Sequence, residues 1–136
     1  MKGGGSQPFL PATLPTPALA RSNLRLARSE VRAKRDVVDG LKDRADASRE
    51  ELAAAGLDVD TAEDDLLDAA EGSPEAIAAD AHHQKACKRA DRARSDLEKV
   101  AATRKLAKGE LHAADKRLAA AREDLEAIRE GRKTRK

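Results

Sequence analysis

Apolar residues recur every three or four positions through most of this chain, a spacing that aligns side chains along one side of an α-helix. In the first half the repeat covers ten positions from Leu24 to Ala55, of which eight are apolar. Gly56 then predicts a helix end, because glycine readily adopts the left-handed conformation found there. Asp60 and Glu63 resemble a capping box, and they predict a second, short helix that runs to residue 71.

The second half carries the same repeat without a skip for seven heptads. Between Ala76 and Ile128, fourteen of the sixteen repeat positions are apolar. The sequence GSPE at 72–75 marks the start of this helix with a stop, an N-cap, a proline at the first helical position and an early acid. A seven-residue repeat of this length predicts left-handed supercoiling around another helix. A helix of roughly 85 Å also needs a partner for its apolar side.

The first half supplies that partner, because the two helical halves are nearly equal in length and a turn separates them. The sequence therefore predicts an all-α fold, a long antiparallel coiled-coil helical hairpin with an extended Pro/Gly-rich N-terminal arm. Its predicted parts are the arm at 1–17, the hairpin at 18–130 (18–55 and 60–71 against 74–130, with the turn at 72–73) and a basic C-terminal tail at 131–136.

One alignment of the two helices matches side-chain sizes well. It places Val31 opposite Leu118, and small residues mostly opposite small ones. The predicted turn fits this alignment if about four residues loop out, and the break at 56–59 would supply them. Shifts of seven residues are also admissible, because the repeat has that period. In the favoured alignment Gly40 and Gly109 face each other, which indicates a bend, a close approach of the helices or chance.

The N-terminal arm contains three consecutive glycines and four prolines, which exclude a helix and favour an extended backbone. It also carries three large apolar residues that have no local core to enter: Phe9, Leu10 and Leu14. Two interpretations stay open. The arm is either a disordered tail or a segment that docks these side chains onto a partner protein and becomes ordered there.

Composition argues against a large globular core. The chain has 29 alanines, one phenylalanine, no tryptophan and no tyrosine, while 38% of its residues are charged. A single cysteine excludes an intramolecular disulfide and does not indicate an oxidising compartment. Prolines interrupt any signal peptide, and no apolar stretch is long enough to cross a membrane. We therefore expect a cytoplasmic protein, or one incorporated in a virion assembled in the cytoplasm.

The net charge of +2 is unevenly distributed. Residues 56–75 carry eight acids and no base, whereas residues 129–136 carry a net charge of +4. The acids near the turn predict an acidic tip: Asp58, Asp60, Glu63, Asp64, Asp65 and Asp68. The bases at the open end are candidate contacts for nucleic acid or another polyanion: Arg129, Arg132, Lys133, Arg135 and Lys136. No aromatic residue accompanies them for base stacking, which makes nucleic acid the less favoured partner.

Candidate metal and catalytic sites fail on spacing. His83 and Cys87 lie four residues apart and could bind zinc together, but a structural zinc site needs four ligands, and His112 is too far along the same helix. The acids do not fit a calcium-binding EF-hand, because Glu63 occupies the position of its glycine and Ala69 that of its last ligand. The chain has no phosphate-binding glycine loop and no catalytic triad. We therefore expect no catalytic residue, no metal site, no cofactor and no enzymatic activity.

Three functional hypotheses follow from these patterns. The leading one is a structural or assembly protein, a rigid spacer or connector that docks on protein partners through its arm, forms a homo-oligomer or a repeated assembly such as a phage particle, and has no membrane partner. The second is a small nucleic-acid-associated protein that uses its basic open end. The third is a helical adaptor or chaperone that pairs with a partner's helix.

Overall fold

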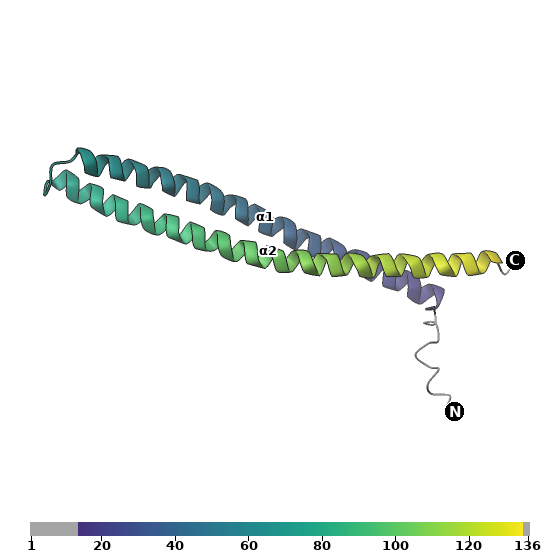
Figure 1. Ribbon diagram of the computed structural model, residues 1–136. Coiled ribbons are helices and arrows are strands. Elements are labelled where there is room, and N and C mark those ends of the chain that lie inside the picture. Colours follow the sequence, from purple (N-terminus) through teal and green to yellow (C-terminus); the bar gives the residue numbers. More distant parts are fainter. Residues whose placement is uncertain (1–13, 135–136) are drawn as a thin grey trace, which may run out of the picture. The chain divides into compact units, whose positions relative to one another are not determined.

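The computed structural model describes residues 14–134, with side chains up to residue 131. It contains two α-helices, α1 (Pro17–Asp68) and α2 (Pro74–Thr134), which pack against each other as a helical hairpin (Figure 1). The predicted all-α class and the helical hairpin are therefore confirmed, whereas supercoiling stays a prediction. The contacts divide the chain into two compact units. One joins the residues up to Ala33 with those from Leu111 onward, and the other comprises Lys34–Glu110.

The start of α1 is capped by Thr16. Its hydroxyl oxygen accepts a hydrogen bond from the amide of Leu19 at 3.2 Å, and its carbonyl oxygen accepts one from Ala20 at 2.8 Å. Pro17 occupies the first helical position, where its missing N–H costs nothing. The helix thus begins one residue before the predicted hairpin boundary. Of the predicted arm, residues 1–13 lie outside the described residues, and 14–16 form no regular element.

The turn has the local structure that its sequence predicts. Gly72 adopts a φ of 75°, the left-handed conformation that favours glycine. The Ser73 hydroxyl accepts a hydrogen bond from the amide of Ala76 at 3.2 Å, which is the expected N-cap of α2. However, α1 ends at Asp68 rather than at residue 71, so the connection spans residues 69–73.

The predicted interruption at Gly56 is wrong, and so are the predicted helix start at Asp60 and the loop at 56–59. Helix α1 continues through all of these residues. The physical reason is that the apolar repeat also continues, since Ala55 and Ala62 are both 0% exposed on either side of half-buried Val59. Burial on this side of the helix offsets the cost of one internal glycine, about 1 kcal/mol relative to alanine.

The predicted end of α2 at residue 130 is also wrong, because the helix continues to Thr134. Gly131 does not end it. Among the described glycines only Gly72 has a positive φ, so Gly131 keeps a conformation compatible with the helix. The segment predicted as a separate tail therefore begins as the last turn of α2.

The core of the first unit is a small apolar cluster. Val31, Ala114 and Leu118 are buried there, and three partly buried residues pack against them: Leu24, Ala27 and Leu111. The cluster contains both Val31 and Leu118, as the predicted alignment requires. Two turns of each helix are thus held together by side chains of moderate size.

The core of the second unit consists mainly of alanine. Its buried residues are Val38, Leu41, Ala45, Ala55, Ala62, Ala79, Ala86, Ala90, Ala93, Val100 and Ala107. No charged residue is buried among the described residues. Arg104, which is half-buried, has an Nε atom without a hydrogen-bond partner. The core of this unit is therefore narrow and contributes little apolar area per residue.

The close approach proposed for Gly40 and Gly109 is wrong. A Cβ atom added to either residue would meet no neighbouring atom within 4 Å. Both glycines lie on exposed parts of their helices, so neither is required by packing.

Neither helix of the described region contains a segment that is both long and apolar enough to cross a membrane.

Candidate functional site

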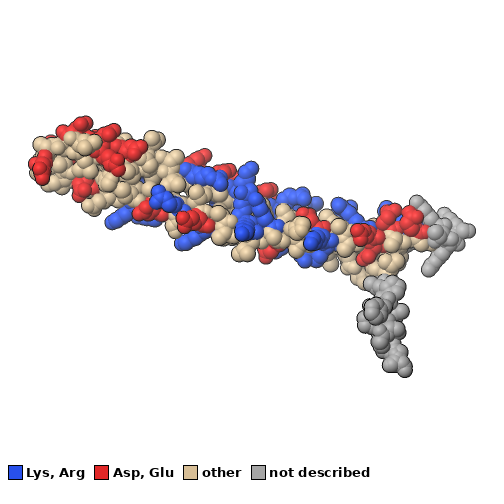
Figure 2. Space-filling model, viewed as in Figure 1, with Lys and Arg blue, Asp and Glu red and all other residues tan. Residues whose placement is uncertain are grey.

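The six acids predicted as an acidic tip all lie between Asp58 and Asp68 in α1. Two of them are engaged: Asp58 accepts a hydrogen bond from Arg89, and Glu63 lies 3.4 Å from His83. The others are exposed and make no ion pair with any residue that the structure describes: Asp60, Asp64, Asp65 and Asp68. On the face drawn in Figure 2, acidic side chains gather around the loop end of the second unit.

A hollow of about 680 Å³ opens beside the loop, between the end of α1 and the start of α2. Four alanines line it: Ala69, Ala70, Ala78 and Ala79. Three carboxylates also line it, and we call them its acidic rim: Asp65 and Asp68 of α1 and Glu75 of α2. Ser73 and His82 complete the lining. We call this feature the loop-end hollow. It combines apolar surface with an excess of negative charge.

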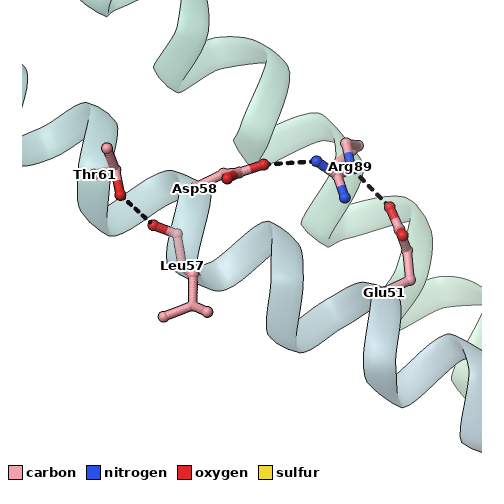
Figure 3. A network of polar contacts seen from close by, with 5 residues as sticks. All are labelled: Glu51, Leu57, Asp58, Thr61 and Arg89. Atoms are coloured by element: carbon pink, nitrogen blue, oxygen red, sulfur yellow. Dashed lines mark hydrogen bonds and ion pairs between the residues drawn. The ribbon is translucent and has the colours of Figure 1, made fainter.

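Next along the second unit, Arg89 of α2 bridges two acids of α1 (Figure 3). Its Nε donates to Glu51 Oε1 at 2.7 Å, and its Nη1 donates to Asp58 Oδ2 at 2.7 Å. The hydrogen bond from Arg89 and then its positive charge lower the pKa of Glu51. The same pairing with Glu51 raises the pKa of Arg89 further above its usual value. The guanidinium therefore stays charged and ties α1 to α2.

Removing this bridge should weaken the hairpin in a pH-dependent way. The pKa of Glu51 is lower in the folded state than in the unfolded state, so its contribution is present above the ordinary value of 4.5 and is lost as the pH falls through the folded pKa. We expect Arg89→Gln to lower the free energy of unfolding at neutral pH, with the difference from the parent protein shrinking in acid. Urea denaturation at a series of pH values, at low ionic strength, measures this difference.

Arg94→Gln is the matched control. Arg94 pairs with Asp91 of the same helix at 3.2 Å, so its loss removes no contact between α1 and α2. Equal losses of stability in the two variants at every pH would contradict a bridging role for Arg89.

His83 and Cys87 of α2 form a smaller cluster with Glu63 of α1. His83 Nε2 lies 3.4 Å from Glu63 Oε1 and 3.7 Å from Cys87 Sγ. Cys87 Sγ is also 3.9 Å from His83 Nδ1, so the sulfur lies beside the ring instead of in line with one nitrogen. This is not the geometry in which a base activates a thiol nucleophile. Within residues 14–131, no group of three or more potential ligands is arranged to hold a metal ion.

The predicted partner-binding residues are only partly visible. Leu14 is 47% exposed just before α1, whereas Phe9 and Leu10 lie outside the described residues. In the first unit a groove of about 310 Å³ runs between the helices, where Arg117 Nη2 pairs with Glu30 Oε1 at 2.6 Å. Leu26 lines this groove and is 67% exposed. Of the three predicted partner-binding residues, the structure therefore places only Leu14.

The predicted basic residues lie at the end of α2. Arg129 is exposed and approaches Glu126 of the same helix at 3.9 Å. Arg132 and Lys133 belong to the last turn of α2, but their side chains are outside the described part, as are Arg135 and Lys136 entirely. The prediction of a polyanion contact is therefore not tested by these positions.

Two features were missed in the sequence although signals for them existed. Thr16 followed by Pro17 repeats the pattern of Ser73 followed by Pro74, and it could have identified the cap of α1. Arg89 could have been found by searching for opposite charges beside the apolar repeat, where ion pairs between packed helices occur.

Comparisons with models of protein families, with curated proteins and with solved structures found no match for this chain. The function is therefore inferred from the geometry and charges of the chain itself.

Proposed function

We propose that this chain is a non-enzymatic structural or assembly protein: a coiled-coil spacer that docks on a protein partner through its N-terminal arm, within a larger repeated assembly such as a phage particle. The observation that carries this proposal is the nature of the core. Only a stripe of small and medium apolar residues is buried, and no large side chain is fully buried in the part of the chain that the structure describes. Most other described side chains are exposed and can contact other molecules.

The buried stripe also supports the coiled-coil component of the proposal. In α1 the buried and half-buried apolar residues follow one another at spacings of three, four or seven positions. They are Val31, Val38, Ala45, Leu52, Ala55, Val59 and Ala62. Such spacing keeps one side of a helix against its partner when the two wind around each other. Flanking charges such as Arg89 then fix orientation, as in other paired helices.

The arm is proposed as the docking element because its large apolar residues lie in a proline-rich sequence that supplies no local core. Leu14 is half-exposed just before the capped start of α1, so its side chain is accessible to a partner. A segment rich in proline loses less conformational entropy on binding than a flexible one, so it suits recognition in an extended form.

Replacing Phe9, Leu10 and Leu14 together by serine tests this function. We expect unchanged helicity and an unchanged melting temperature, because Leu14 is exposed and the described core consists of residues from α1 and α2. We also expect loss of the protein partner that copurifies with the tagged parent chain from its native cells. Circular dichroism and mass spectrometry of the purified complex measure the two outcomes.

A matched control replaces three leucines that are exposed on the helices: Leu57, Leu67 and Leu106. This variant should retain the partner. The proposal is wrong if the arm variant retains the partner as well, or if the arm variant melts much earlier than the parent because the arm packs on its own hairpin. Copurification of nucleic acid that is lost at high salt would instead support the nucleic-acid alternative.

A further inference from the structure

The rim of the loop-end hollow carries negative charge that the described part of the chain does not neutralise. Asp65, Asp68 and Glu75 make no ion pair with any described residue, unlike Glu51 and Asp58, which share Arg89. The sequence explains the difference, since no lysine or arginine occurs between Arg49 and Lys85. Any lysine or arginine that neutralises this rim must therefore come from outside this stretch of the chain.

The alanines that line the hollow indicate what kind of cation fits. Ala69, Ala70, Ala78 and Ala79 present apolar surface rather than the oxygen ligands that a metal ion requires. Lysine and arginine side chains combine an aliphatic stem with a charged end, so they can cover alanine while their charge reaches a carboxylate at the rim. The hollow is thus suited to a basic peptide segment.

The chain itself contains such a segment at the end of α2. Residues 129–136 include five basic residues and one acid, which gives a net charge of +4. The hollow includes residues from the first turns of α2, and the basic segment includes its last turns, so the two features lie near opposite ends of one continuous helix of 61 residues. The two features cannot meet within one copy without breaking that helix.

We propose that the loop-end hollow binds the basic segment 129–136 of a second copy of this chain. This inference deepens the proposed assembly function and rests on it, because it names one of the partners. Each copy then offers one hollow and one basic segment, so the contact is heterologous and joins copies into open chains or closed rings. Ion pairs at an exposed rim set orientation and respond strongly to salt, so association should be weak and favoured at low ionic strength.

Two variants with opposite defects test this contact. The hollow variant removes three negative charges and keeps the side-chain shapes: Asp65→Asn, Asp68→Asn and Glu75→Gln. The segment variant removes four positive charges: Arg132→Gln, Lys133→Gln, Arg135→Gln and Lys136→Gln. Sedimentation velocity of the full chain gives the mass distribution at about 0.02 M and about 0.5 M salt, which correspond to weak and strong screening. Circular dichroism verifies that each variant keeps the helicity of the parent.

At low salt the parent should form species larger than a dimer. Each variant alone should self-associate with a dissociation constant at least about tenfold higher than that of the parent. An equimolar mixture of the two variants should form a complex of one copy of each and grow no further. The reason is that the hollow variant supplies an intact basic segment and the segment variant supplies an intact hollow, while their remaining ends are defective. High salt should dissociate every complex.

The charge-matched control carries Asp36→Asn, Asp39→Asn and Asp43→Asn, which are exposed residues of α1 away from the hollow. It should associate like the parent. The inference is overturned if the parent stays monomeric at low salt, if the control weakens association as much as the hollow variant does, or if the mixture of variants does not pair. A negative result in this experiment does not contradict the proposed function. That function is tested separately, by the loss of a protein partner in the arm variant.

Discussion

Ala114→Asp is expected to lower the free energy of unfolding by about 3–5 kcal/mol, the cost of leaving a buried charge without a partner. Ala114 is 0% exposed and lies in the cluster formed by Val31 and Leu118. No basic side chain is buried in the described core, so the new carboxylate would find no counter-ion there. It would either disrupt the packing of α1 on α2 or become protonated, and both outcomes reduce stability.

Chemical denaturation followed by circular dichroism measures this loss. The control is Ala119→Asp, which introduces the same residue into the same helix at an exposed position. Ala119→Asp should lower the free energy of unfolding only by the difference in helix propensity between alanine and aspartate, about 0.5 kcal/mol. Similar losses in the two variants would contradict the assignment of the apolar side of α2, because only one of the two positions faces α1.

Replacing three helical glycines by alanine is expected to stabilise the protein by about 3 kcal/mol in total, since each replacement contributes about 1 kcal/mol in a helix interior. The three residues are Gly40, Gly56 and Gly109. None of them has a neighbouring atom within 4 Å of an added Cβ, and none has a positive φ. The gain comes mainly from reduced conformational entropy of the unfolded chain, without any new contact.

The sign of the effect should reverse at the turn. Gly72 has a φ of 75°, a conformation that a residue with a Cβ adopts at an energetic cost, so Gly72→Ala should be destabilising by about 1 kcal/mol. Thermal melting of the single variants and of the triple variant tests both signs. A decrease in melting temperature for Gly40→Ala or Gly109→Ala would show that these positions approach another helix after all.

Much of the fold could be predicted because its causes are local or periodic. The apolar repeat predicted the helical regions, although it was divided wrongly at Gly56, and the sequence from Gly72 to Glu75 predicted the turn and the cap by Ser73. Gly56 was misjudged because glycine ends a helix only where the following residues gain nothing by continuing it. Here Val59 and Ala62 gain burial against the other helix, a tertiary effect that a local signal does not contain.

The candidate site was less predictable because it depends on which residues of the two helices lie opposite each other. The six acids lie in the last turns of α1, and two of them are engaged by Arg89 and His83 of α2, which the sequence did not predict. The hollow was not predicted at all, since its lining residues come from both sides of the turn. Neither feature follows from the composition of one helix.

The sequence by itself determined the helical class, the hairpin, the N-cap at Ser73 and the concentration of acid near the turn, because periodicity, local hydrogen bonding and net charge are properties of neighbouring residues. Only the tertiary structure decided how α1 pairs with α2. The clearest example is Arg89, which contacts Glu51 and Asp58, two acids spaced by one heptad. A seven-residue repeat looks the same after a shift of seven, so only the packed side chains could show that Arg89 binds both.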